Sequence, residues 1–397
     1  MEKQSQQWIK KAERVLMPNY ARFPLVFTKG KGSTLVSADH ISYLDFVSGI
    51  AVNSLGHCSK SLVKAVCKQA ESLLHISNLY YNIPQIALAE WLTAHSFADQ
   101  VFFCNSGAEA NEAAIKLARL FAKTIDQHRF EIISAENSFH GRTLATLSAT
   151  GQKKHQEGFD PLPQGFVHVP FDNVDAIEKA ITPNTAAVLL EPIQGEGGVR
   201  IPKSNYLSEV RKLCDKNNLL LILDEVQTGI GRTGTLFAYE QSGIMPDIMT
   251  LAKGLGGGFP IGAMLASRKI SAVFTPGKHA STFGGNLLAC SAANAVVKQM
   301  TPLFLKRVEK IGTYLFEKLV LLQGRTGLIK EVRGAGLLVG IDLSLPALKI
   351  IQKAHDKGLL LSRTSDNTVR MTPPLTVTRK EIDQAISMMK EVLGVKA

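Results

Sequence analysis

The feature that most limits the possible folds of this chain is an alternation of short apolar runs with stretches of helical periodicity. The apolar runs lie at residues 101–103, 131–133, 187–190, 219–223 and 248–251. They are far shorter than the roughly 20 residues of a membrane-spanning helix and have the lengths of buried strands. After the first run, small and apolar residues recur at helical spacing, at Ala110, Ala113, Ala114, Leu117 and Phe121. This spacing predicts a helix from near Ala108, and the alternation favours an α/β fold with a mostly parallel sheet.

The pattern changes near residue 286, where a smaller unit is predicted to begin. A helix-like start is followed by a strand-like stretch, a helix-like patch and another strand-like stretch, at residues 334–342, 347–357 and 369–371. For 397 residues, a prior of about 150 residues per domain suggests two or three compact units. We therefore expect a large α/β domain and a smaller α+β domain.

The charge balance raises an alternative class of function. The chain has 45 Lys and Arg residues against 34 Asp and Glu residues, a formal net charge of +11, and basic patches can bind phosphate backbones. The basic residues are dispersed, without a run of five or more and without the interleaved aromatics of RNA-binding motifs. We expect a solvated basic surface that attracts small anions, without a nucleic acid or membrane partner. A polyanion-binding protein is the alternative.

Cysteine usage and the N-terminus predict the cellular compartment. The five cysteines are an odd number without CxxC spacing, which predicts reduced and mostly buried thiols. Cys104, next to a turn, is interpreted as a packed core thiol rather than a reactive one. The polar start MEKQSQQWIK lacks the apolar stretch of a secretory signal, so we expect the cytoplasm. No motif predicts a metal site.

A first motif, FFCNSGAEANEAAIKLAR, places Ser106, Gly107 and Ala108 between a predicted strand and a predicted helix. Backbone N–H groups at a helix start lack partners within the helix and point along the helix dipole, so they attract anions. Small residues let a phosphate approach them. Many turns of this composition bind nothing, so the motif alone only suggests a phosphate site.

A second motif, LLLILDEVQTGIGRTG, ends an apolar strand with Asp224. Side chains at the C-terminal end of a parallel strand face the crevice in which α/β proteins bind ligands. A carboxylate at this point can pair with a protonated ring nitrogen. Alone, the motif is more typical of a surface Asp followed by a turn.

A third motif, DIMTLAKGLGGGFPIGAM, ends another strand with Lys253 and a cluster of glycines. A partly desolvated lysine near another cation has a lowered pKa and becomes a nucleophile for carbonyl carbons. The glycines leave room for a flat ring. The cluster also imitates a dinucleotide-binding fingerprint, but Phe259 and Pro260 interrupt the helix that such a fingerprint requires.

Two shorter pieces, SFHGRT and STFGGN, contain residues typical of ligand pockets. Phe139 can stack on a ring, Arg142 can bind a carboxylate through two hydrogen bonds, and Thr282 can bind phosphate through its hydroxyl. Taken singly, each is more typical of a core or loop residue.

Together, and in this order, these pieces resemble the class III aminotransferases of pyridoxal-phosphate fold type I, from about Tyr20 to the C-terminus. Within that family the likeness is greatest to the acetylornithine aminotransferases, judged from YARFPL, GIAVNSLGHC, EPIQGEGGV and the motifs above. The resemblance implies a homodimer with pyridoxal 5'-phosphate as cofactor. It implies a large domain from residues 50–285 and a small domain built from both chain ends, residues 1–49 and 286–397.

The resemblance also implies a set of cofactor-binding residues: Ser106, Gly107, Ala108, Phe139, Asp224, Gln227, Lys253 and Thr282. Lys253 would bind the cofactor covalently and, once released, carry the proton. Asp224 would pair with the ring nitrogen, and Gln227 would lie near the ring hydroxyl. Phe139 would stack on the ring, while Thr282 would reach the phosphate from the second subunit. Lys253 and Asp224 are the predicted catalytic residues.

The implied substrate residues are Tyr20, Arg142, Glu196, Ser281 and Arg370. Arg142 is similar to the residue that binds the substrate carboxylate. Glu196 and Arg370 are similar to a switching pair that separates two substrates. Tyr20 is similar to a residue of the pocket wall.

Two segments depart from the usual pattern of the family, at residues 38–41 and 56–60. They put local turn geometry in doubt rather than the cofactor chemistry. His57 and His140 are interpreted as structural, because Lys253 is the natural proton carrier.

The expected reaction is transfer of the terminal amine of N-acetylornithine to 2-oxoglutarate, giving a semialdehyde and glutamate, in arginine biosynthesis. N-succinyldiaminopimelate (in lysine biosynthesis) and succinylornithine are further candidate donors. The acylated donor is favoured because Ile50, Ala51 and Val52 predict an apolar wall that offers an ammonium no acceptor. Ornithine aminotransferase, 4-aminobutyrate aminotransferase and an aminomutase of the same fold remain alternatives.

Overall fold

The apolar runs form the strands of a large sheet in the computed structural model, which describes residues 4–395. The expected strands are β4 (Gln100–Cys104), β5 (Glu131–Ala135), β7 (Thr185–Leu190), β8 (Leu220–Asp224) and β9 (Ile248–Leu251). Two strands that the pattern did not indicate, β6 (Phe166–Val169) and β10 (Gly262–Ala266), complete the order β4-β10-β9-β8-β7-β5-β6. The pairs β5·β6, β5·β7, β7·β8 and β8·β9 are parallel, whereas β10 runs antiparallel to both neighbours. The prediction of a mostly parallel sheet is confirmed.

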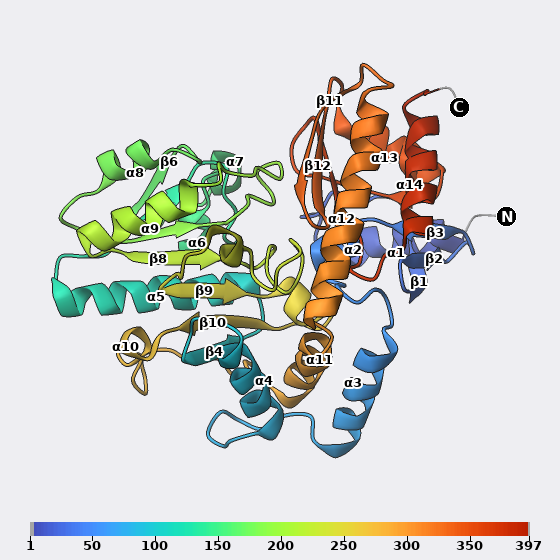
Figure 1. Ribbon diagram of the computed structural model, residues 1–397. Helices are drawn as coiled ribbons and strands as arrows, with labels where there is room; N and C mark the ends of the chain where they lie inside the picture. The colour runs from blue at the N-terminus through green and yellow to red at the C-terminus, as the bar shows by residue number, and fades with distance from the viewer. Residues whose placement is uncertain (1–3, 396–397) are drawn as a thin grey trace.

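Helices cover both faces of this sheet (Figure 1). Because successive strand residues point to opposite faces, Ile222 packs with α5 (Gly107–Ile125), while Leu221 and Leu223 pack with α9 (Tyr206–Asn217). Helix α5 begins one residue before the predicted Ala108. Helices α4 (Ile83–Ala94) and α8 (Val174–Ala180) also belong to the layer with α9. Burial on both faces explains why these strands read as continuous apolar runs.

The smaller unit is built from both ends of the chain. Strands β1 (Phe27–Lys31), β2 (Thr34–Ser37) and β3 (Ser42–Asp45) are antiparallel, and β13 (Leu359–Leu360) pairs in parallel with β3. A second sheet has the order β11-β12-β15-β14, with β11 (Ile329–Ala335), β12 (Leu338–Leu343), β14 (Ser362–Arg363) and β15 (Thr368–Met371). Helices α12 (Pro302–Gln323), α13 (Ala347–Asp356) and α14 (Arg379–Val392) belong to this part of the chain, at one end of the molecule in Figure 1. The domain boundaries themselves stay a prediction.

One predicted stretch differs in the structure. Residues 334–342 read as a single strand, but they contain the turn between β11 and β12. Gly336 occupies the turn with φ +54°, and a Cβ there would lie 2.6 Å from the carbonyl oxygen of Arg232. The close approach of two backbones therefore fixes the turn, and apolar periodicity does not record it.

The remaining elements are short helices, the N-terminal helix and two packed helices near the sheet edge: α1 (Gln4–Val15), α2 (Ser48–Ala51), α3 (Lys60–Ser72), α6 (Leu144–Ala149), α7 (Lys153–Gln156), α10 (Arg268–Ser271), α11 (Leu287–Val297), η1 (Ala238–Ser242) and η2 (Lys253–Leu255). Across residues 4–395, none of the helices combines the length and apolarity needed to cross a bilayer. Cys104, Cys214 and Cys290 are buried free thiols, whereas Cys58 and Cys67 are free and exposed. Burial raises the pKa of Cys104 to about 12, which agrees with its interpretation as a core thiol.

Candidate active site

The predicted cofactor residues converge where strands of the large sheet end. A cavity of about 430 Å³ is lined by Ser106, Gly107, Ala108, Phe139, Asp224, Gln227 and Lys253, among others. Asp224 is the last residue of β8, and Lys253 follows β9 after one residue. Ser106 caps the helix that follows β4. The topology thus brings three separate motifs to one edge of the sheet, as the sequence predicted.

Lys253 is buried and held in a strained backbone conformation. Its φ is +40°, in the left-handed region that disfavours side chains other than glycine. The segment is fixed by a hydrogen bond from the Ser54 hydroxyl to the Gly254 carbonyl, at 3.0 Å. Desolvation lowers the pKa of Lys253, although the nearby carboxylate of Glu196 opposes the shift. A lowered pKa leaves more of the amine neutral, which is the nucleophilic form.

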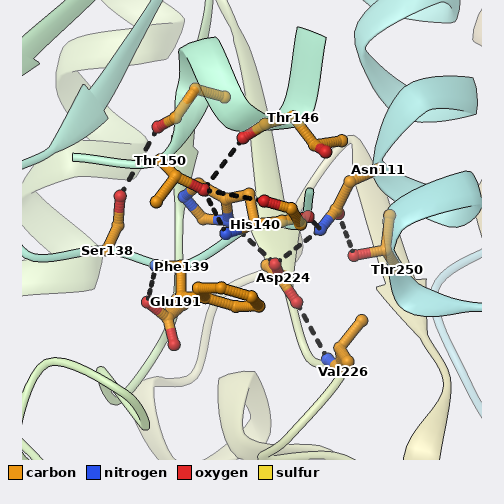
Figure 2. A network of polar contacts seen from close by, with 12 residues as sticks. Asn111, Ser138, Phe139, His140, Thr146, Thr150, Glu191, Asp224, Val226 and Thr250 are labelled. Carbon is orange, nitrogen blue, oxygen red and sulfur yellow. Dashed lines mark hydrogen bonds and ion pairs between the residues drawn. The ribbon is translucent and has the colours of Figure 1, made fainter. Parts of the chain in front are cut away.

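Asp224 is the centre of a buried hydrogen-bond network (Figure 2). Its Oδ2 accepts from Asn111 Nδ2 at 2.7 Å and from His140 Nδ1 at 2.8 Å, and its Oδ1 accepts from the backbone N–H of Val226 at 3.0 Å. Thr250 donates to Asn111 Oδ1 at 2.7 Å, which fixes the orientation of that amide. The donors stabilise the carboxylate and hold it facing the cavity. His140 thus orients Asp224, consistent with its interpretation as structural.

The start of α5 is an anion-binding arrangement. Ser106 is the N-cap and accepts from the Glu109 N–H at 3.2 Å, while the N–H groups of Gly107 and Ala108 belong to the first turn, which has no acceptors within the helix. A Cβ at Gly107 would lie 2.8 Å from a methyl group of Val226. A side chain at position 107 would therefore press against Val226, which also lines the cavity.

A second cavity of about 860 Å³ adjoins the first and shares Phe139, Arg142, Glu196 and Lys253 with it. Tyr20 also lines this second cavity. The guanidinium of Arg142 lies 5.7 Å from the centre of the Phe139 ring. Three of the predicted substrate residues, Tyr20, Arg142 and Glu196, therefore line the same cavity as Lys253, and this cavity is large enough for an amino acid.

Glu196 and Arg370 form an ion pair at the junction of the two cavities. Arg370 Nη1 donates to Glu196 Oε1 at 2.6 Å and to Gln227 Oε1 at 3.1 Å, and Arg370 is only 1% exposed. Desolvation raises the pKa of Glu196, but Arg370 and Lys253 outweigh it, so the net shift is downward. The predicted pair is therefore formed, with Arg370 behind Glu196 rather than on the cavity wall.

Ser281 and Thr282 lie outside the cavity of this chain. Ser281 Oγ accepts from Asn105 Nδ2 at 3.2 Å, and Thr282 is exposed. The predicted contact of Thr282 with a phosphate in a second subunit stays a prediction. His57 Nε2 donates to Asp45 Oδ2 at 2.7 Å, and the other oxygen of Asp45 accepts from the Ser48 N–H, so this pair supports the start of α2.

Sequence reasoning missed Asn111 and Glu191, which both contact the predicted residues. Asn111 is a buried amide on the face of α5 that packs on the sheet. Glu191 directly follows the apolar strand β7, as Asp224 ends β8, so the same strand-end signal was available. Asn111 stands among alanines and two glutamates, and this local composition gave no indication of its partner.

The residues present fit pyridoxal phosphate, which the resemblance implied. The open start of α5 suits a phosphate, and the buried carboxylate of Asp224 suits a protonated ring nitrogen. The buried amine of Lys253 suits an aldehyde, and the ring of Phe139 suits a flat aromatic ligand. Across residues 4–395, no cluster of His, Cys, Asp and Glu side chains could hold a metal ion.

Comparison with known proteins gives a consistent result. A family model described as aminotransferase class-III matches residues 15–393. An acetylornithine aminotransferase of Caldanaerobacter subterraneus subsp. tengcongensis is 53% identical, over 96% of this chain and 98% of that protein. A solved acetylornithine aminotransferase of Elizabethkingia anophelis has a TM-score of 0.88 and 34% identity, over 98% of each chain. An ornithine aminotransferase of Toxoplasma gondii, with pyridoxal phosphate at partial occupancy in its active site, has a TM-score of 0.95 and 34% identity, over 98% of this chain and 94% of that one.

Proposed function

This chain belongs to the class-III aminotransferases, and we propose that it transfers the terminal amine of N-acetylornithine to 2-oxoglutarate. The cofactor is pyridoxal phosphate, which supplies an electron sink when it is bound. The observation that carries the proposal is the convergence of a buried amine, a buried carboxylate and an open helix start on one cavity. Relatives about 50% identical over nearly their whole length are acetylornithine aminotransferases, which supports this donor.

The residues of the first cavity have distinct roles in this proposal. Lys253 binds the cofactor through its Nζ and, when displaced by a substrate amine, moves a proton away from the amine-bearing carbon. Asp224 holds the proton on the ring nitrogen, because a carboxylate beside a cation favours the charged form. The N–H groups of Gly107 and Ala108 bind the phosphate, Phe139 orients the ring, and the wall of the cavity limits the access of water.

The second cavity selects the amino donor. Arg142 binds the donor's α-carboxylate with two hydrogen bonds, so the distal amine reaches the first cavity. The remaining α-nitrogen lies near Tyr20 and Ile50, and Glu196, the carboxylate in this wall, is already paired with Arg370. An ammonium would lack a free carboxylate there, whereas an acylated nitrogen is neutral. The geometry therefore favours N-acetylornithine over free ornithine.

2-Oxoglutarate carries a second carboxylate that N-acetylornithine lacks. We place this carboxylate at Arg370, which becomes available when Glu196 turns away into the second cavity. The two half-reactions then share one site, and the first product leaves before the second substrate binds. Ping-pong kinetics follow from this order.

An exposed apolar surface favours assembly into a homodimer. The dimer patch, defined here as Leu79, Tyr80, Tyr81, Ile83 and Phe283, consists of side chains that are at least 59% exposed. Asn78 Nδ2 donates to the carbonyls of Ser281 and Gly284, so the patch surrounds the loop of Thr282. Burying it against a second copy would bring Thr282 to another subunit's cavity. This assembly and a cytoplasmic location are both part of the proposal.

The test is a donor panel with 2-oxoglutarate as the acceptor. We expect kcat/KM for N-acetylornithine to exceed that for free ornithine by at least about tenfold, because each decade corresponds to about 1.4 kcal/mol and an uncompensated buried charge costs more. Equal values, or a preference for ornithine or 4-aminobutyrate, would contradict the donor. Repeated turnovers without 2-oxoglutarate, beyond one equivalent of product per cofactor, would indicate an aminomutase.

The cofactor site has an independent test. Borohydride reduction of the holoenzyme should fix the cofactor on Lys253, seen as a mass increase on the peptide that contains it. An adduct on another lysine would refute the assignment. Salt-sensitive RNA binding by a colourless protein would favour the polyanion-binding alternative.

A further inference from the structure

Glu191 is a buried carboxylate at the cavity wall, and its two oxygens serve two different loops. Its Oε1 accepts from the Phe139 N–H, in the loop between β5 and α6, at 3.0 Å (Figure 2). Its Oε2 accepts from the Gly195 N–H, in the loop after β7, at 3.0 Å. A single side chain therefore connects segments that lie more than 50 residues apart in the sequence.

Both loops carry side chains of the proposed active site. The first loop presents the Phe139 ring to the cavity. In the second loop, Gly195 precedes Glu196, and the Gly195 carbonyl accepts from Arg370 Nη1 at 3.3 Å. A Cβ at Gly195 would lie 2.3 Å from Gln227 Oε1, so this loop is packed tightly against the group that also binds Arg370. A movement of the first loop therefore changes the position of the Phe139 ring, and a movement of the second loop changes the Glu196–Arg370 ion pair.

The pKa of Glu191 also lies close to neutral pH. Desolvation raises the pKa of Glu191 to about 7, with His140 lowering it and Asp224 raising it. The charged and titratable groups around it are His140, Asp224, Lys253 and, beyond Gly195, the Glu196–Arg370 pair. A protonated carboxyl group keeps one good acceptor oxygen instead of two. Protonation therefore weakens one of its two backbone hydrogen bonds.

We propose that Glu191 is a positioning residue that couples these two loops. In this proposal, the position of the Phe139 ring and the geometry of the Glu196–Arg370 pair change together. The consequence for substrate choice rests on the proposed function, in which this pair must open for dicarboxylates. The coupling itself does not rest on the proposed function, because it is a property of backbone hydrogen bonds in the cofactor-free protein.

The chain offers a matched control in Glu225. This carboxylate is also buried, and desolvation raises its pKa to about 7. It likewise accepts from two backbone groups, the N–H of Ala238 at 3.0 Å and that of Tyr239 at 2.8 Å. Those amides belong to η1 and not to the loops of Phe139 and Gly195. Neutralising Glu225 therefore reproduces the loss of a buried carboxylate without touching the proposed coupling.

The first experiment measures amide hydrogen exchange in the cofactor-free forms of the wild type, Glu191→Gln and Glu225→Gln. In Glu191→Gln we expect the amides of Phe139 and Gly195 both to exchange faster, by about tenfold or more, the effect of losing a hydrogen bond to a charged acceptor. In Glu225→Gln the acceleration should be confined to Ala238 and Tyr239. The coupling is wrong if Glu191→Gln leaves either Phe139 or Gly195 unchanged.

The wild type gives a second measurement that needs no variant. After correction for intrinsic exchange chemistry, Phe139 and Gly195 should lose protection together as the pH falls through about 7, where Glu191 becomes protonated. Protection that stays constant, or that is lost at only one of these amides, would overturn the coupling. The result remains decisive even if Glu191→Gln does not fold.

The last measurement uses the holoenzyme and single turnovers with L-glutamate and with N-acetylornithine. Releasing the Gly195 loop should raise the glutamate rate relative to the N-acetylornithine rate by about fivefold in Glu191→Gln, a typical coupling between neighbouring groups. Glu225→Gln should keep the wild-type ratio. An unchanged ratio in Glu191→Gln refutes the effect on substrate choice. If the wild type transaminates neither donor, the proposed function fails, while the exchange data still decide the coupling.

Discussion

Replacing Glu196 by glutamine tests whether Glu196 masks Arg370 while a mono-carboxylate donor is bound. In the wild type, the side-chain carboxylate of the substrate L-glutamate can reach Arg370 only by displacing Glu196 from its 2.6 Å contact with Arg370. N-acetylornithine needs no such displacement, because its single carboxylate is the α-carboxylate, which binds Arg142 in the proposed function. The substitution keeps the shape of the side chain but removes its charge. We therefore expect Glu196→Gln to favour glutamate as the donor in the first half-reaction.

The size of the effect follows from the surroundings of the pair. Breaking a fully buried ion pair costs about 3–5 kcal/mol. Glu196 is 26% exposed, and Arg370 would keep its contacts with Gln227 Oε1 and the Gly195 carbonyl. We therefore expect about 1–3 kcal/mol, which is roughly 5- to 150-fold in the ratio of the two donors.

The assay is a stopped-flow single turnover of the cofactor-loaded enzyme with L-glutamate or N-acetylornithine. Glu331→Gln is a suitable control, because Glu331 pairs with Arg333 at 2.8 Å outside both cavities. We expect the glutamate-to-N-acetylornithine ratio of maximal rate over apparent Kd to rise in Glu196→Gln and to stay constant in the control. If both donors slow by the same factor, Glu196 does not act as a switch.

Three further outcomes are expected. Asp224→Ala leaves Asn111 and His140 without their shared acceptor and should lower kcat/KM by at least about a hundredfold, since loss of a buried charged partner costs about 3–5 kcal/mol; wild-type turnover would exclude its role. Gly107→Val should weaken cofactor binding by at least about tenfold in an equilibrium titration, because its side chain would collide with Val226 and displace the cavity wall at the start of α5; unchanged affinity would place the phosphate elsewhere. Glu225 has its pKa raised from 4.5 to about 7, so the folded state keeps a proton that the unfolded state releases, and stability falls as the pH rises between these values. In Glu225→Gln that fall should be smaller by about 2 kcal/mol in urea unfolding at pH 5 and 7.5, and an equal fall in both proteins would contradict the shift.

The sequence revealed the central strands because they are buried on both faces, so their apolar character is continuous. It also indicated Lys253 and Asp224, because both lie at strand ends where the chain becomes polar or glycine-rich. Strand β10 was missed because Gly262–Ala266 has weak strand propensity and becomes a strand by pairing with β4 and β9. Tertiary context therefore decides this strand.

The partners of the catalytic residues could not be predicted in the same way. Asn111 and Asp224 are 113 positions apart, and their hydrogen bond depends on how α5 lies against the sheet. Glu191 carried the same strand-end signal as Asp224, but its partners are backbone amides, which every residue type except proline offers. Periodicity and composition describe each segment alone, so contacts between segments need the assembled fold.

The pairing of β3 with β13 has a consequence during synthesis on the ribosome. Leu44 pairs with Leu359, which is translated more than 300 residues later. At roughly 5–20 residues per second, the edge of β3 therefore waits about 15–60 s for its neighbour. During that interval the nascent chain presents unpaired N–H and C=O groups that another chain could pair with. A variant whose C-terminal residues are moved ahead of β1 would shorten this exposure without changing the finished sheet.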